Sequence, residues 1–302
     1  MNPVGAGPAA LPVALPWRHA VLAIAIMAIW GSNFVVMKTG LAHLPPLFFA
    51  ALRFLFVVVP VIFFVRRPAV PWRDLAAYGV LIGVGQFGIL FFALDGLISP
   101  GLASLVIQTQ VVFTIGLSMA LSGERLARLQ WLALALAAAG LIVIARHTDA
   151  NTSVTGLLLT LAAAASWACA NIVARRAGRV DMLAYVVWSA LFAVPPLFVL
   201  AFIAEGSEAM LRGVQEADTA TWGALAWQSI GNSLFGYAAW GWLLARHPAT
   251  LVSPMALLVP VFGLGSSALF LGEDLPAWKI AAALLVLGGL ALNLAAPWLR
   301  RR

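Results

Sequence analysis

The side chains of this sequence best suited to chemistry are amides and aromatic rings set within long apolar runs. Trp30 and Asn33 are three residues apart, and Trp167 and Asn171 are four apart, so each pair shares one helix face. An indole and an amide on one face can offer hydrogen bonds to a zwitterion and an apolar wall to its side chain. Alternatively, each asparagine hydrogen-bonds a neighbouring helix. Both interpretations stay open, and the recurrence of the pair favours a ligand cavity.

Three further amides lie deep within apolar runs, at Gln86, Gln108 and Gln110. Polar groups that face lipid are costly, so such amides face a cavity or another helix. Gln108 and Gln110 point about 200° apart on a helix, and one cavity cannot take both. We expect Gln108 to bind a ligand and Gln110 to bind a helix neighbour.

A polar and aromatic stripe follows the apolar run near residue 230. Ser229, Ser233, Tyr237 and Trp240 recur every three or four residues. An aromatic face packed on neighbouring helices is one explanation. The serines and the phenol favour a cavity wall, because a stripe used only for packing seldom needs them.

Prolines and glycines mark two other functions of the backbone. Pro254 and Pro260 interrupt one apolar run, where each removes an amide donor and frees a carbonyl. Such breaks can act as hinges or line a site, or are merely tolerated. Gly79 and Gly83 form a small-residue face, for which close helix packing is the expected role.

Charged groups inside the apolar runs are few. Arg53 can attract a carboxylate, or it can pair with Asp95 or with carbonyls at a helix end, and we favour this structural role. No Asp or Glu lies near the middle of an apolar run. A membrane-embedded carboxylate for proton coupling is therefore not expected.

The residues needed for an enzyme are not arranged for catalysis. One cysteine, Cys169, cannot build a thiolate metal site, and there is no His-Glu-x-x-His motif, serine elbow or phosphate-binding loop. The histidines lie at the ends of apolar runs or between them, at His19, His43, His147 and His247. The sequence predicts no metal, no cofactor and no enzymatic activity. A channel or a receptor remains an alternative to a carrier.

These side chains must be positioned by helices in a membrane. Of 302 residues, 63% are hydrophobic and 10% are charged, against about 25% charged in soluble domains. The apolar runs are long enough to cross a hydrocarbon core about 30 Å thick, and a crossing segment must satisfy its own backbone. We predict an all-α integral membrane protein with ten spans, at residues 20–37, 46–65, 75–94, 101–121, 130–145, 156–174, 182–204, 222–245, 249–271 and 278–297.

The charge distribution predicts the orientation of the spans. Thirteen of the eighteen basic residues fall on one side, and Glu205, Glu208, Glu216, Asp218, Glu273 and Asp274 fall on the other. This asymmetry is typical of the positive-inside rule and predicts that both termini are cytoplasmic. The net charge of +7 is thus a topology signal and predicts no nucleic-acid partner. Residues 1–19, rich in Ala, Pro and Gly, are expected to form a disordered cytoplasmic segment.

An internal repeat relates residues 101–146 to residues 250–295 at an offset of 149. Ser104 matches Ser253, and the turn 123–126 (Gly-Glu-Arg-Leu) matches the turn 272–275 (Gly-Glu-Asp-Leu). Five spans separate the copies, so equivalent segments cross the membrane in opposite directions. Two inverted five-helix halves, at residues 20–146 and 154–297, predict a carrier with its site between the halves. A duplication in a protein that transports nothing is the alternative.

The motif Trp30-Gly31-Ser32-Asn33-Phe34 with Lys38, the repeat and the Gly-Glu-x-Leu turns resemble the EamA family of the drug/metabolite transporter superfamily. The resemblance covers residues 20–297 and is closest to bacterial O-acetylserine/cysteine exporters, through residues 44–47, 101–108, 166–169 and 257–261. It implies ten helices around a central cavity and export of small amino-acid metabolites. Multidrug exporters of this superfamily carry a glutamate in the first span, where this chain has Asn33, so cationic drugs are not expected as substrates.

We therefore predict a bacterial inner-membrane, multi-pass secondary transporter that works by alternating access. It would export small amino acids or their cysteine- or O-acetylserine-like metabolites. We hypothesise facilitated export, uncoupled from protons, with coupling through peripheral carboxylates as the alternative. Another alternative is a carrier for another neutral or zwitterionic metabolite, importing rather than exporting. The expected partners are a small-molecule substrate and the lipid bilayer. A monomer is expected, since one chain holds both halves, with the fifth and tenth spans as a surface for dimers.

Overall fold

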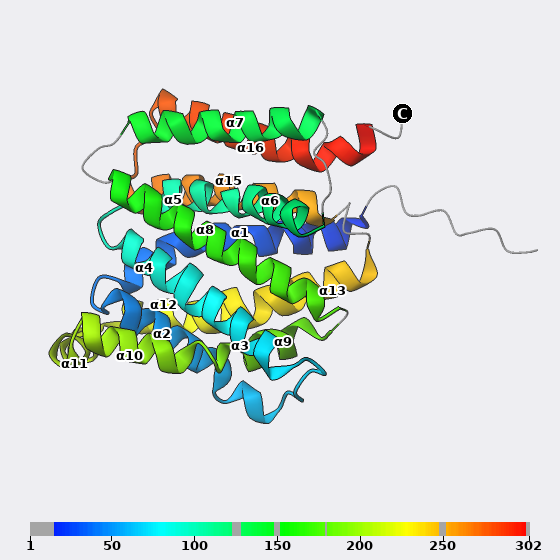
Figure 1. The fold of residues 1–302 in the computed structure, drawn as a ribbon. Coiled ribbons are helices and arrows are strands. Elements are labelled where there is room, and N and C mark those ends of the chain that lie inside the picture. Colours follow the sequence, from blue (N-terminus) through cyan, green and yellow to red (C-terminus); the bar gives the residue numbers. More distant parts are fainter. Residues whose placement is uncertain (1–14, 123–127, 148–151, 179, 248–251, 300–302) are drawn as a thin grey trace, which may run out of the picture.

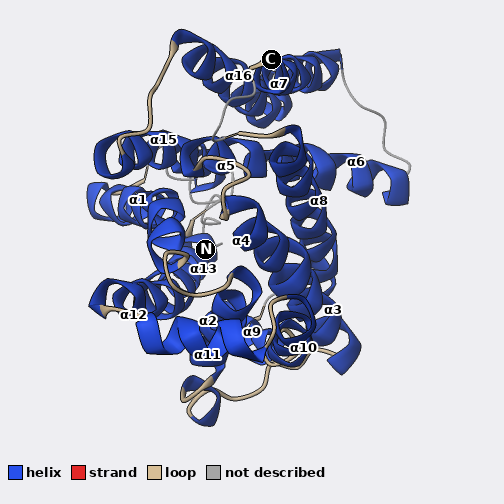
Figure 2. Cartoon of the chain, turned by 90° about the vertical axis from the view of Figure 1, so that its left-hand side faces the viewer, coloured by secondary structure: helices blue, strands red, loops and turns tan. Residues whose placement is uncertain are grey.

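The computed structural model describes residues 15–122, 128–147, 152–178, 180–247 and 252–299, and within these ranges it is helical without β-strands (Figures 1 and 2). The first part of the chain forms α1 (Trp17–Gly40), α2 (Pro46–Val58), η1 (Val61–Phe63), α3 (Trp72–Val80), η2 (Leu81–Gly88), α4 (Ile89–Leu94), α5 (Pro100–Val106), η3 (Ile107–Thr109), α6 (Gln110–Ser122) and α7 (Arg128–Arg146).

The second part forms α8 (Val154–Arg176), α9 (Met182–Ala190), α10 (Val194–Ala204), α11 (Ser207–Glu216), α12 (Thr219–Ala226), η4 (Trp227–Phe235), α13 (Gly236–Arg246), η5 (Ser253–Leu257), α15 (Leu258–Leu271) and α16 (Ala277–Leu299). Helix α1 begins at Trp17, three residues before the predicted span. The predicted disorder of residues 1–14 lies outside the described residues.

Six described segments are long and apolar enough to cross a membrane, at Trp17–Gly40, Pro46–Phe63, Trp72–Leu94, Pro100–Leu117, Val154–Arg176 and Met182–Ala204. Three shorter apolar helices cover Trp131–Arg146, Met255–Leu271 and Ala277–Leu292. Large apolar side chains point outward along them, as at Phe63 (79% exposed) and Leu269 (76%). Such a surface suits lipid, and the chain is a helical membrane protein.

The helix starts follow from the local sequence. Pro46 and Pro100 occupy the first turns of α2 and α5, where no amide donor is needed. Ser153, Asp181 and Asp218 cap α8, α9 and α12, because each side-chain oxygen accepts a backbone N–H of the first turn. The pKa of Asp218 is lowered because its carboxylate accepts hydrogen bonds from Thr221. The bond from the Thr221 N–H has the larger effect and the bond from its hydroxyl the smaller.

Helix α11 was not predicted from the sequence. Its segment 205–221 was expected to be only a connection, but Ser207–Glu216 forms a short helix. Its first turn holds Glu208, and most of its side chains are exposed, with Gly213 buried against His43 and Pro45. The helix is polar overall and too short to span, so the sequence offered no apolar signal for it.

Carboxylates at the ends of two helices hold the first turns of other helices. Glu273, which follows α15, accepts the N–H of Gly101 at 3.0 Å and the hydroxyl of Ser99 at the start of α5. Lys279 donates to the same carboxylate at 3.0 Å, and both side chains are buried. Glu273 thus caps the first turn of α5. Residues 123–126, the matching turn of the repeat, lie outside the described residues.

Glu205 serves the start of α2 in the same manner. Its two oxygens accept the N–H groups of Leu47 at 2.6 Å and Phe48 at 3.0 Å. Burial raises the pKa of this carboxyl, while the two N–H groups oppose the rise. A buried, partly satisfied carboxylate thus closes the junction between α10 and α2.

The helices pair in a regular pattern. Helix α1 packs on α15 and on the α12–α13 segment, while α8 packs on α6 and on the α3–α4 segment. Helix α2 packs on α10, and α7 packs on α16. Figure 1 shows α7 and α16 side by side at one edge of the molecule, beyond α5 and α15. Helix α1 therefore has neighbours in the second part that correspond in chain order to the neighbours of α8 in the first part.

Helices α1 and α8 run in opposite directions. Lys38, near the end of α1, donates to the Leu94 carbonyl at the end of α4, at 3.2 Å. The N–H of Ser153, at the start of α8, donates to the Leu97 carbonyl just after α4, at 2.8 Å. The end of α1 and the start of α8 therefore share one end of the molecule. At the other end, ring nitrogens of His19 and His247 are 2.6 Å apart.

The small-residue face on α3 and η2 packs closely against α9 and α10, as predicted. A Cβ atom on Gly79 would lie 2.0 Å from the Ser189 carbonyl oxygen, and one on Gly83 would lie 2.2 Å from the Ala193 Cβ. These distances are shorter than any ordinary contact, so glycine sets the separation of the two segments.

Replacing Gly83 with valine should lower the thermal stability of the purified protein, with a cost of about 1–3 kcal/mol from overpacking. The matched control is Gly265→Val in α15, because a Cβ there meets no atom within 4 Å. Tryptophan fluorescence during heating measures both. Equal melting temperatures for the two variants would contradict the close packing.

The Glu205 pKa predicts a pH dependence. This pKa is raised in the folded protein. The contribution of the protonated carboxyl to the free energy of unfolding is therefore fully present below the unfolded pKa, and it is lost as pH rises through the folded pKa. The stability of the wild type relative to Glu205→Gln should therefore fall as the pH rises above about 4.3, the ordinary pKa of a glutamate. Paired melting curves over this range test it, and a constant or rising difference would refute the assignment.

Candidate functional site

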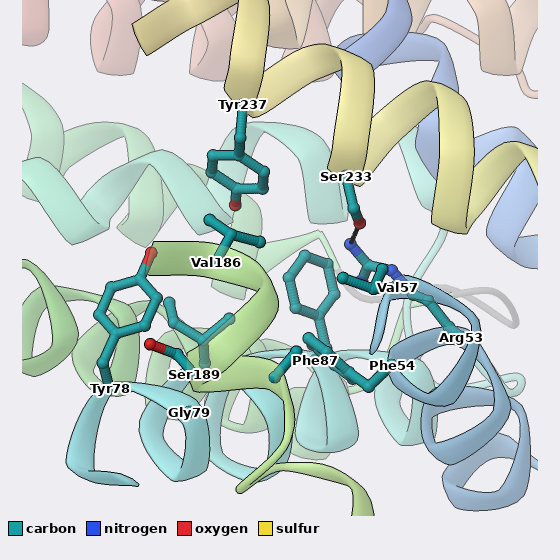
Figure 3. Close-up of a pocket in the computed structure, with 12 residues that line it drawn as sticks. Arg53, Phe54, Val57, Tyr78, Gly79, Phe87, Val186, Ser189, Ser233 and Tyr237 are labelled. Carbon is teal, nitrogen blue, oxygen red and sulfur yellow. Dashed lines mark hydrogen bonds between the residues drawn. The ribbon is translucent and has the colours of Figure 1, made fainter. Parts of the chain in front are cut away.

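A small cavity lies where both parts of the chain meet. It is bounded by α2, α3 and η2 from the first part and by α9, η4 and α13 from the second. Figure 3 shows side chains from these elements pointing toward one another. Its walls are Arg53, Phe54, Val57, Tyr78, Gly79, Ile82, Phe87, Val186, Ser189, Ala190, Ser233 and Tyr237.

The cavity is closed around very little free space. The centres of water-sized spheres can occupy about 20 Å³ of it, which is room for about one water molecule. A bound metabolite would need the walls to separate. The cavity is thus a small space between two groups of helices.

Arg53 supplies the only charge on the cavity wall, all of whose residues are described. Its side chain is 1% exposed, and its Nη2 donates to the Ser233 hydroxyl at 2.9 Å (Figure 3). Its Nε and Nη1 atoms have no partner among the described residues. The sequence-based preference for a structural pair with Asp95 or a helix end is corrected here, because α2 turns Arg53 into the cavity.

Aromatic rings hold the Arg53 guanidinium in place. Its central carbon lies 3.6 Å from the ring centroid of Phe87 and 5.1 Å from that of Phe54. Stacking on Phe87 is favourable for a desolvated cation. Since the N–H groups lie in the guanidinium plane, stacking leaves them directed sideways.

Ser233 reaches Arg53 because its helix is locally wide. The segment Trp227–Phe235 is a π-helix, whose wider turns shift the hydrogen-bond register. The Ser233 hydroxyl donates to the carbonyl of Gln228, five residues earlier, at 2.9 Å and accepts from Arg53. Ser229 donates to the Arg53 carbonyl at 3.1 Å. The predicted stripe thus divides, with Ser233 and Tyr237 on the cavity and Ser229 fixing α2.

Trp30 and Trp240 lie behind the cavity wall. The ring centroid of Trp30 lies 5.5 Å from that of Tyr237 and 5.6 Å from that of Trp240. The Trp30 indole donates to the Asn232 carbonyl at 3.2 Å. Trp30 therefore supports Tyr237, Trp240 packs on Trp30, and neither lines the cavity.

Hydroxyl groups gather at the other end of the cavity. The rings of Tyr78 and Tyr185 are 4.7 Å apart, from α3 and α9. The Tyr185 and Ser189 hydroxyls are buried and have no partner among the described residues. None of the three residues stands out in the sequence, because they lie among apolar residues, and the packing of α3 on α9 is what brings Tyr78 to Tyr185 and Ser189.

The two predicted asparagines occupy different surroundings. The Asn33 amide donates to the Gln228 side chain at 3.4 Å, across to η4, and its Oδ1 is buried without a described partner. Asn171 donates to Gln110 at 2.9 Å and to Thr114 at 3.3 Å on α6. Both amides thus join helices, as the alternative interpretation holds, and the two pairs are not equivalent in space.

The remaining predicted binding residues lie away from the cavity wall. Gln108 donates to the Ala256 carbonyl at 3.3 Å and joins η3 to η5. Trp167 packs, partly buried, on the core. Gln86 is 3% exposed beside Phe87 in η2, and its Oε1 has no partner within the described part of the chain. Of these three, Gln86 is the one adjacent to a wall residue.

The predicted hinge lies at a change of helix type. Segment Ser253–Leu257 is a 3₁₀ turn, and Pro260 is buried in the first turn of α15. There its missing amide costs nothing. The Pro254 side chain lies outside the described residues. A matching 3₁₀ turn, Ile107–Thr109, breaks the α5–α6 segment.

A second hollow of about 220 Å³ lies beside α11. It is wide and polar, with charged or titratable side chains at its rim from His43, Asp95, Arg212 and Glu216. His43 contacts the Thr221 hydroxyl at 2.8 Å. Its acidic and basic groups are solvent-facing, in contrast to the buried Arg53.

Comparison with known protein families identifies the family of this chain. The EamA-like transporter family matches residues 17–146 and 154–295, which is nearly the whole chain. The chain belongs to the EamA-like transporter family. It is a multi-pass inner-membrane protein and a metabolite transporter rather than an enzyme.

Named relatives agree with this membership. The chain is 41% identical over 282 residues to a "Probable amino-acid metabolite efflux pump" of Salmonella typhimurium and, equally, to one of Escherichia coli, covering 91% of this chain and 94% of each relative. An "Uncharacterized transporter YoaV" of Bacillus subtilis is 27% identical over 281 residues, covering 89% of this chain and 94% of the relative. A solved crystal structure with a TM-score of 0.63 and 20% identity covers 95% of this chain and 99% of its own, which shows a shared fold.

The geometry separates a wall residue from a helix-joining residue. Tyr237→Ala should reduce transport at least tenfold with an unchanged fold, because it removes a ring and a phenol from the cavity. Asn171→Ala should instead lower stability by about 1–2 kcal/mol and leave the half-saturation concentration near that of the wild type, because Asn171 contacts α6. Transport in vesicles and melting in detergent, measured on both variants, test this. A reversed pattern would place the substrate at α6 and α8.

Proposed function

We propose that this chain is a secondary transporter that exports small amino acids or their metabolites, of the cysteine and O-acetylserine class, by alternating access. The names of the Salmonella and Escherichia relatives support export of amino-acid metabolites, and the narrower cysteine and O-acetylserine class comes from the sequence resemblance. The observation that carries the proposal is the closed cavity to which both halves contribute, with α2, α3 and η2 facing α9, η4 and α13.

Two inverted five-helix halves, 20–146 and 154–297, with ten spans and cytoplasmic termini, form the framework of this mechanism. The opposite directions of α1 and α8 support it, as does the matching of helix neighbours between the halves. In such carriers the halves rock about a central site. A cavity with space for about one water molecule would then correspond to an occluded conformation, between the inward-open and outward-open conformations.

The chain would work as a monomer, because both sides of the cavity come from one chain. Helices α7 and α16 pack on each other, away from the cavity, and carry exposed apolar side chains such as Trp131 (63%) and Leu284 (70%). That surface suits lipid, and dimers through it would leave the site intact.

A second candidate is a carrier of the same family for another small neutral or zwitterionic metabolite, working in the import direction. The mixed wall of rings, hydroxyls and aliphatic groups favours a small, partly apolar compound without fixing its identity. Transport is proposed to be uncoupled from protons, since no carboxylate stands on the wall. Stimulation by an imposed pH gradient would refute the uncoupled mechanism.

Inverted vesicles containing the purified chain should take up labelled cysteine and O-acetylserine saturably. Ala190→Trp, which fills the cavity, should abolish uptake, whereas Leu284→Trp on the lipid surface should retain it. Gel filtration and melting curves check that both variants fold, and Val57→Phe is a milder filling variant. Uptake of neither compound by the folded wild type would reject this substrate class. Full uptake by Ala190→Trp would reject the cavity as the route.

A further inference from the structure

We propose that Arg53 binds the carboxylate of the transported compound, and that the cavity recognises this carboxylate rather than an amino group. The inference rests on the proposed function, since it names what the same cavity binds. It predicts that monocarboxylates without an amine bind, while amines without a carboxylate do not.

The hydrogen-bond count of Arg53 is the first support. A guanidinium carries five N–H donors, and in this structure the protein accepts one bond, at Ser233. The Nε and Nη1 atoms are buried and unpartnered among the described residues. A buried donor without a partner is costly, and a ligand carboxylate supplies the acceptor that fits a guanidinium best.

The charge balance is the second support. Arginine stays protonated in proteins, so a positive charge is enclosed at 1% exposure. None of the residues around the cavity is an Asp or a Glu. The ion pairs formed by described side chains involve other residues, at His43–Asp218, Arg73–Asp74 and Lys279–Glu273. A buried charge needs a counter-charge, and a ring face offsets it only in part.

The position of Arg53 is the third support. The guanidinium is clamped between the Phe87 ring, 3.6 Å from its centroid, and the Ser233 hydroxyl, so one orientation is fixed. Arg53 belongs to the first half and Ser233 to the second. A carboxylate bound there contacts the junction of the halves, where opening and closing would alter its contacts.

The rest of the wall offers no charge for an ammonium group. What it presents is apolar side chains, the hydroxyls of Ser189 and Ser233 and the phenols of Tyr78 and Tyr237. Neutral oxygens and ring faces can contact an amine, but they do not require an amine as a partner. The cavity should therefore discriminate strongly at the acid group and weakly at the amine.

Ligand-induced stabilisation of the purified wild type tests this without any variant. We compare 3-mercaptopropionate, which is cysteine without its amine, with cysteamine, which is cysteine without its carboxylate. The acid should raise the melting temperature in a saturable manner and the amine should not. In vesicles, the acid should compete with labelled cysteine at least about 30-fold more effectively than the amine.

Substitutions then assign the effect to Arg53. Arg53→Met should remove the discrimination between acid and amine, and Arg53→Lys should keep part of it, because a lysine keeps the charge but loses the planar donors. The matched control is Arg73→Met, whose side chain is 85% exposed and lies outside the cavity wall, and discrimination should persist there. If Arg53→Met does not fold, the lysine variant and the wild-type comparison still decide.

The outcomes separate this inference from the proposed function. Stabilisation by the acid alone, with no transport of cysteine, would support Arg53 as a carboxylate site and reject the exporter assignment. Saturable cysteine transport with equal competition by acid and amine would support the exporter and overturn the carboxylate inference. Discrimination that survives in Arg53→Lys and Arg53→Met alike would give Arg53 a packing role only.

Discussion

The structure depends on one constraint, that a chain in hydrocarbon must satisfy its own backbone hydrogen bonds. Regular helices meet this constraint residue by residue. A departure from the regular helix releases carbonyls and N–H groups and survives only where the protein itself supplies partners. In this chain the π-helices Leu81–Gly88 and Trp227–Phe235 lie against other helices at the cavity, where Ser233 bonds the Gln228 carbonyl.

The two kinds of irregular helix occur in different segments of the chain. Both π-helices stand in cavity-lining segments, whereas the 3₁₀ turns Ile107–Thr109 and Ser253–Leu257 stand in the next segments of each half. Gln108 joins these two turns through the Ala256 carbonyl. The polar side chains of the interior thus serve two purposes. Gln108, in a 3₁₀ turn, holds helices together, whereas Ser233, in a π-helix, faces the cavity.

The enclosed guanidinium concentrates the cost of burial at one place. Some neutral polar groups of the interior are paired across helices, as between Asn171 and Gln110. Arg53 is held by Phe87 and Ser233 but keeps donors free. A site of this kind is stabilised by its ligand, and it gives the two halves a shared contact at their junction. Tightly packed glycines beside it, such as Gly79, keep α3 against α9 while the space inside stays small.

The sequence alone determined the positions of the membrane helices, because each such helix requires a long run of apolar residues. Helices lie within every predicted span, and the small-residue face at Gly79 and Gly83 is confirmed. Local patterns also placed Ser233 and Tyr237 on a cavity wall. Each of these features follows from neighbours one or two turns apart.

Tertiary structure alone decided which polar groups meet. Asn33 and Asn171 have similar local sequences but face η4 and α6, and Arg53 turns from Asp95 toward Ser233, 180 residues away. Helix α11 is short and polar, so no apolar run announced it. The rotation of a helix about its axis depends on the shapes of all its neighbours. A sequence records which face is polar, but only packing determines what that face touches.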